Sequence, residues 1–124
     1  MLCSLSILLK MKNEKILSNK NINNFSYREF KKTIKEQLGL YVYISAFDNR
    51  HKFPHLHIDK GDASAVLNLI TMEFIELPNK EKYKFIYIKK ILEKSPVLTK
   101  NLISYFCQKN PQLGYCKKYK NNRI

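Results

Sequence analysis

The sequence has few of the residues that are typical of disulfide-rich, zinc-binding or membrane proteins. Its three cysteines, Cys3, Cys107 and Cys116, are an odd number without C-x-x-C spacing, so neither a disulfide framework nor a zinc knuckle is expected. No run approaches the ~20 apolar residues of a membrane span. The apolar opening at residues 2–9 lacks a preceding basic segment and is too short for a signal peptide. These absences favour a reduced, cytoplasmic protein that does not associate with membranes.

Acidic residues are also scarce. The chain has 10 Asp and Glu against 23 Lys and Arg, which gives a net charge of +13. The excess is concentrated in residues 78–124, with twelve basic and two acidic side chains, whereas residues 41–77 are slightly acidic. Such a charge predicts an anionic partner, and nucleic acid, RNA more than DNA, is the first candidate. A Lys-rich composition with solvated helix faces would give the same totals.

The length of 124 residues and the 44% hydrophobic content indicate a single domain. We expect residues 1–24 to be a weakly structured lead-in, residues 25–110 to be the globular core and residues 111–124 to be a mobile basic tail. The core begins with a helix, because Ser26 and Glu29 form a capping box and Gly39 provides a stop.

After this helix the hydrophobic period changes from helical to two residues. The alternation predicts four strands, at residues 40–47, 55–60, 63–70 and 73–77. Their short connections require mostly antiparallel pairing. Two helices follow, one capped by Asn79 and the next begun by Ser95-Pro96 and ended by Asn110-Pro111. The expected fold is therefore α+β: an antiparallel sheet of about four strands, with an N-terminal helix and two C-terminal helices packed on one face.

Two of the three histidines lie in the predicted strand 55–60. Pro54 suits the first position of a strand. The alternation directs Leu56 and Ile58 to the core and places His55, His57 and Asp59 on the opposite face, which we expect to be exposed. The third histidine, His51, lies in the preceding polar loop, close enough to fold back towards that face.

Three interpretations of the histidines remain open. His55 and His57, with His51 nearby, are candidate catalytic residues that act as general acid and base in RNA cleavage, without a metal or another cofactor. In the second interpretation the three histidines bind a metal ion together with Asp48 or Asp59. In the third they are half-buried strand residues with a structural role.

Basic and aromatic residues supply the candidate nucleic-acid contacts. Near the histidines these are Arg50, Lys52 and Lys60, which would hold a phosphate. The C-terminal part of the chain interleaves lysines with tyrosines, as in surfaces that stack bases within a basic groove; rim positions of a small core have the same composition. The candidates there are Lys82, Lys84, Lys89, Lys90, Lys117, Lys118, Tyr119, Lys120 and Arg123.

Several of these features occur together in residues 43–110. The order is Asp48-Asn49-Arg50-His51, Pro54-His55-Leu56-His57-Ile58, Gly61, Ala65-Val66-Leu67, a hairpin bearing Glu73 and two closing helices. This run resembles the small bacterial P-H-x-H domain of unknown function, some members of which are described as toxins of toxin–antitoxin pairs (DhiT-like). The resemblance implies an intracellular protein that is neutralised by a small cognate antitoxin.

The favoured function is a toxin-like, nucleic-acid-directed protein that acts as a small metal-independent ribonuclease. The alternative is a non-catalytic inhibitor of the anti-CRISPR kind, encoded by a phage or mobile element, that binds a nucleic-acid-guided nuclease or its RNA. Both functions require the basic flanks, whereas only the enzyme requires both imidazoles. The expected partners are thus RNA and either an antitoxin or a nucleoprotein complex.

Overall fold

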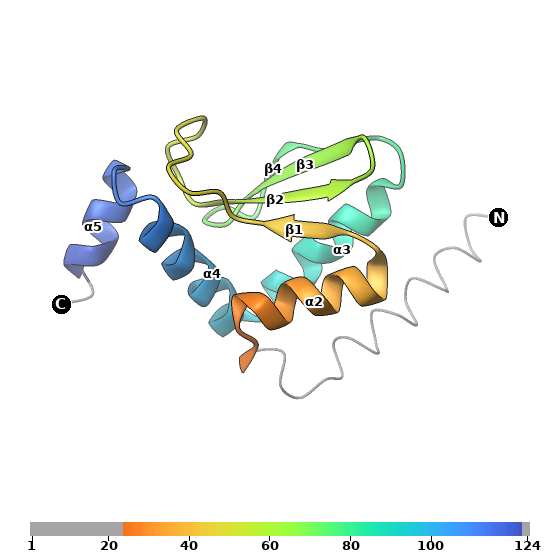
Figure 1. The fold of residues 1–124 in the computed structure, drawn as a ribbon, viewed down its shortest axis with the longest axis horizontal. Coiled ribbons are helices and arrows are strands. Elements are labelled where there is room, and N and C mark those ends of the chain that lie inside the picture. Colours follow the sequence, from red (N-terminus) through yellow and green to blue (C-terminus); the bar gives the residue numbers. More distant parts are fainter. Residues whose placement is uncertain (1–23, 123–124) are drawn as a thin grey trace.

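The computed structural model describes residues 24–122, which form a four-stranded sheet and four helices (Figure 1). The expected lead-in at residues 1–24 lies, apart from its last residue, outside this part of the chain. The first described helix, α2 (Tyr27–Leu38), has the predicted capping box: the Glu29 amide donates to the Ser26 hydroxyl and the Ser26 amide donates to the Glu29 carboxylate. Gly39 ends it at φ 69°, a left-handed conformation that suits glycine.

The strands form an antiparallel meander in the order β1-β2-β3-β4. Their bounds are β1 (Tyr41–Tyr43), β2 (His55–Lys60), β3 (Ala63–Asn68) and β4 (Phe74–Glu76). The second strand has the predicted limits, and the other three are shorter than predicted. The first strand ends early because the Ile44 amide donates to the Tyr27 hydroxyl at 2.9 Å instead of to a neighbouring strand.

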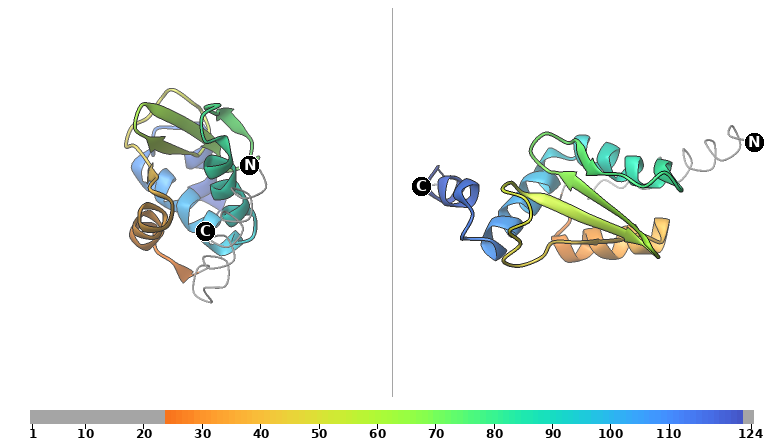
Figure 2. Two further views of the ribbon diagram at one scale, coloured as in Figure 1. Left: turned by 90° about the vertical axis from the view of Figure 1, so that its right-hand side faces the viewer. Right: turned by 90° about the horizontal axis from the view of Figure 1, so that it is seen from above.

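Helices cover one face of this sheet (Figure 2, left). They are α2, α3 (Lys82–Glu93) and α4 (Pro96–Lys109), and the α+β prediction is therefore confirmed. The core between the layers contains Leu56 and Ile58 from β2, both fully buried, with Phe30, Phe85 and Phe106 from the helices. Asn79 does not cap α3, whose N-cap position is taken by Glu81 in a left-handed conformation.

The C-terminal segment differs from the expected tail. Residues Gly114–Asn122 form a further helix, α5, at the end of α4 (Figure 1). Leu113 and Cys116, three positions apart, are buried and bring one side of this segment into the core. Cys107 and Cys116 form a disulfide between α4 and α5, with their Cα atoms 4.9 Å apart. The expectation of no disulfide was thus wrong, because the odd cysteine, Cys3, obscured a pair that the fold brings together.

Candidate functional site: a buried aspartate between two histidines

The polar residues of the P-H-x-H segment converge on one carboxylate. The Nε2 atoms of His55 and His57 each lie 2.9 Å from Oδ2 of Asp48. The strand places both imidazoles on one face, and the loop between β1 and β2 folds over that face to bring Asp48 to them. We call these three residues the Asp–His cluster.

The cluster is buried, unlike the exposed face that the alternation predicted. His55 is 0% exposed, His57 3% and Asp48 8%. The prediction of an open polar face was wrong because the β1–β2 loop and the end of α4 cover it. The ring of Phe106 in α4 meets the His55 ring edge-on at 5.1 Å. The histidines therefore have little direct access to solvent.

His55 has an oxygen acceptor at each ring nitrogen. Its Nδ1 lies 2.9 Å from the carbonyl oxygen of Phe53, and its Nε2 faces Asp48. Both ring nitrogens therefore face an oxygen, and each position suits an N–H donor. The buried Asp48 carboxylate is tolerated there because the histidines and the Arg50 amide surround it with hydrogen-bond partners.

His57 lies nearer the surface, in contact with Arg50 and Tyr43. The Nη2 atom of Arg50 is 3.4 Å from both ring nitrogens of His57, so the guanidinium lies across the imidazole instead of pointing at one nitrogen. The ring of Tyr43, opposite His57 on β1, stacks on the imidazole at 4.8 Å. The Arg50 side chain is 67% exposed and is therefore the accessible edge of the cluster.

Hydrogen bonds set the charge state of the Asp48 carboxylate. Burial raises the pKa of this group, but the hydrogen bonds from His57, His55 and the Arg50 amide outweigh that effect and hold the pKa well below its ordinary value. Burial lowers the pKa of His57, and its hydrogen bond to Asp48 offsets this only in part. The cluster thus favours an ionised aspartate next to a neutral His57.

One residue that sequence reasoning missed anchors the loop. Asn110, fully buried at the end of α4, accepts a hydrogen bond from the Asp48 amide at 2.6 Å. Its Nδ2 donates to the carbonyl oxygens of Ser45 and Phe106. The sequence indicated Asn110 only as part of a helix stop, and no local signal links it to a loop more than sixty positions earlier.

The other predicted cluster residues lie at its edge. The His51 ring is half-buried and meets the His55 ring edge-on at 5.0 Å. Asp59 accepts from the Ser64 hydroxyl at 2.8 Å and, through its charge and a hydrogen bond, adds to the effect of burial in raising the pKa of Tyr43. Among the described residues, the group of side chains that could ligate a metal comprises Asp48, His55 and His57.

Two of the basic candidates lie together next to the cluster. Lys52, from the β1–β2 loop, and Lys118, from α5, line one pocket of about 520 Å³ with Tyr115 and Gln112. The side-chain amide of Gln112 donates to Asn49 in the same loop, at 2.9 Å. We call this the loop–α5 pocket. It brings a basic loop and a basic helix from opposite parts of the sequence to one place.

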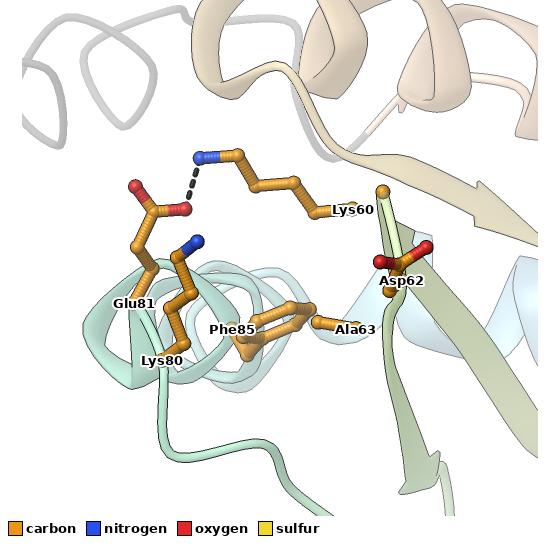
Figure 3. A pocket seen from close by; sticks show the side chains of 7 residues that line it. Lys60, Asp62, Ala63, Lys80, Glu81 and Phe85 are labelled. Carbon is orange, nitrogen blue, oxygen red and sulfur yellow. Dashed lines mark hydrogen bonds and ion pairs between the residues drawn. The ribbon is translucent and has the colours of Figure 1, made fainter.

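Lys60 lies elsewhere. It is at the other end of β2, about 16 Å along the strand from His55 at the usual rise per residue. There it forms an ion pair with Glu81 beside a pocket of about 600 Å³, which Phe85 and Ala63 also line (Figure 3). Lys60 is thus not beside the cluster, and it shares the Glu81 carboxylate with Lys84.

The remaining basic candidates are spread over two helices. Lys82 and Lys90 on α3 are exposed, Lys89 is half-buried, and Lys84 pairs with Glu81 at 3.8 Å. Lys117 on α5 is exposed like Lys118. The side chains of Tyr119 and Lys120, and the whole of Arg123, lie outside the described part of the chain.

Comparison with protein-family models, with curated proteins and with solved structures found no match to the chain. None of the helices in residues 24–122 has the length and apolar character required to cross a membrane.

Proposed function

We propose that this chain is a toxin-like, nucleic-acid-directed protein that binds single-stranded RNA through the loop–α5 pocket. The observation that carries the proposal is that Lys52 and Lys118 both line that pocket, beside the loop that holds Asp48 of the Asp–His cluster. The net charge of +13 supplies the long-range attraction for a polyanion. Tyr115, which lines the same pocket, provides an aromatic surface for a base.

Cleavage of the bound RNA would involve His57. Its imidazole is the one next to the exposed Arg50, whose guanidinium suits a phosphate, and Asp48 orients it through Nε2. His55 serves to position Asp48, because both of its nitrogens are already bonded. General acid–base catalysis by His55 and His57 together needs both imidazoles free. Their hydrogen bonds to Asp48 would have to break first.

A second candidate, a non-catalytic inhibitor that occupies the RNA site of a nucleoprotein, is favoured by a specific observation. Both histidine residues are at least 97% buried and share one carboxylate oxygen, which is an arrangement that suits structural support. This function needs the basic pocket and no chemistry at the cluster.

The salt dependence of RNA binding tests the proposal. The affinity of the protein for a labelled single-stranded RNA is measured by fluorescence anisotropy at several salt concentrations. Each phosphate contact contributes about 0.7 to the slope of log K against log salt for single strands. If Lys52 and Lys118 both contact phosphates, the double variant Lys52→Ala/Lys118→Ala should lower the slope by about 1.4.

The matched control removes the same charge elsewhere. Lys94→Ala/Lys100→Ala changes two exposed lysines near the start of α4, far from the pocket, and should leave most of the slope unchanged. Equal losses of slope in the two double variants would reject the pocket as the binding site.

Gel analysis of the same RNA distinguishes the two proposed functions. Cleavage that His57→Ala abolishes supports the ribonuclease, whereas tight binding without cleavage supports the inhibitor.

A further inference from the structure

The donor atoms of the Asp–His cluster converge as ligands of a metal ion do. Nε2 of His55, Nε2 of His57 and Oδ2 of Asp48 all lie within 4.8 Å of one another, and each nitrogen is 2.9 Å from the oxygen. First-row divalent cations bind such atoms at about 2.0–2.2 Å, and in the tetrahedral geometry that zinc prefers the ligand atoms lie about 3.4 Å apart. The two N–O separations of 2.9 Å are therefore within about 0.5 Å of the spacing around a bound zinc ion.

The proton arrangement around His55 also fits a metal ligand. Nδ1 of His55 lies 2.9 Å from the Phe53 carbonyl oxygen, so the ring can donate Nδ1–H to that oxygen while Nε2, on the side of Asp48, is the nitrogen placed to bind a cation. Ligating histidines in proteins usually donate their second N–H to such an oxygen, which fixes the tautomer and the ring orientation.

The surrounding residues hold the ligands in place. The second carboxylate oxygen of Asp48 accepts from the Arg50 amide at 3.1 Å, so that Oδ2 alone is directed at the imidazoles. Asn110 fixes the Asp48 backbone, and β2 fixes the two histidines at alternate positions of one strand. The outer contacts of a metal site are therefore already formed.

From this geometry we propose that Asp48, His55 and His57 bind one divalent transition-metal ion. Two imidazoles and one carboxylate are borderline ligands that select zinc, iron(II), cobalt(II) or manganese(II) over magnesium or calcium. Three protein ligands leave at least one position for a water molecule or a substrate oxygen, as in catalytic sites. The exposed Arg50 covers the cluster at His57 and has to shift to give access to that position.

This inference is independent of RNA binding at the loop–α5 pocket, but it makes Nε2 of His57 a metal ligand and so replaces the direct role of that imidazole in cleavage. It is tested with the metal alone. The full chain is treated with chelator, freed from it, and titrated by calorimetry with zinc, cobalt(II), manganese(II) or magnesium chloride. We expect binding of one zinc or cobalt ion per chain, visible d–d absorption of the cobalt complex, and no comparable binding of magnesium. Nitrogen-15 NMR should show that the signals of two histidine side chains shift on addition of zinc.

Variants locate the ion. Asp48→Asn and His57→Gln should each weaken zinc binding by more than the roughly 10–100-fold that loss of an outer contact costs. His51→Gln is the matched control, because His51 lies beside the cluster outside the ligand group, and it should bind zinc as the wild type does. Circular dichroism checks that each variant is folded.

The wild-type titration decides the question even if a variant fails to fold. A folded wild-type protein that binds none of the transition metals at one ion per chain would overturn the proposal. So would cobalt binding that His51→Gln abolishes and His57→Gln leaves intact, since the ion would then lie at another histidine.

Discussion

Replacement of Asn110 by alanine should unfold the protein more easily and loosen the Asp–His cluster. The side chain is fully buried and forms hydrogen bonds with the Asp48 amide and with the Ser45 and Phe106 carbonyls. Alanine leaves the buried Asp48 amide without a partner, at a cost of about 1–3 kcal/mol, and the half-buried Ser45 carbonyl adds a further contribution. We therefore expect the free energy of unfolding to fall by about 2–4 kcal/mol.

Urea denaturation, followed by circular dichroism or by tyrosine fluorescence since the chain has no tryptophan, measures this change. Asn101→Ala on the exposed side of α4 is the control, and should change stability by no more than about 0.5 kcal/mol. Asn110→Asp keeps an acceptor for the Asp48 amide but removes the donor to Ser45 and adds a second carboxylate. A loss below about 1 kcal/mol in Asn110→Ala would refute the anchoring role.

Two further predictions concern the ion pair and the disulfide. The hydrogen bond from Lys60 lowers the pKa of Glu81, so the pair adds stability above the ordinary pKa of a glutamate and loses it as the pH falls through the lowered value. The stability difference between wild type and Glu81→Gln should thus stay below about 1 kcal/mol at pH 7 and shrink as the pH falls below the ordinary pKa of a glutamate in urea titrations; a difference independent of pH would argue against the pair. Cys116→Ser removes a link between residues nine positions apart, worth roughly 2–3 kcal/mol in the chain-entropy model. Hydrogen exchange should then speed up in α5 and not at β2 and β3, and unchanged exchange in α5 would contradict the tethering role.

The sequence predicted those elements whose ends carry local signals. α2 has a capping box and a terminal glycine, and β2 lies between Pro54 and the Gly61 turn. β1 was predicted too long because its alternation continues past Tyr43, while the backbone is diverted by a tertiary contact with the Tyr27 hydroxyl. α5 was predicted as a tail because its lysines and tyrosines outweighed the short apolar spacing of Leu113 and Cys116.

The candidate site was predictable in part. The period of two placed His55 and His57 correctly on one face, but it contains no information on the loop that buries that face. Lys60 was grouped with the histidines as a candidate phosphate contact, although the rise of a strand places it about 16 Å from His55. That separation follows from the sequence positions alone. Asn110 could not be found, since its role depends on where α4 ends relative to the loop.

The meander and the Asn110 bridge differ in the sequence separation of their contacts. Each strand pairs with its neighbour along the chain, whereas Asn110 and Asp48 are 62 positions apart. Local pairings form early in folding and distant ones carry a larger loop-closure cost, so the bridge should be absent from the rate-limiting transition state. Substitutions at Asn110 should then accelerate unfolding and leave the refolding rate nearly unchanged. The half-life of the assembled cluster would thus be set by a contact that plays no part in how quickly the sheet forms.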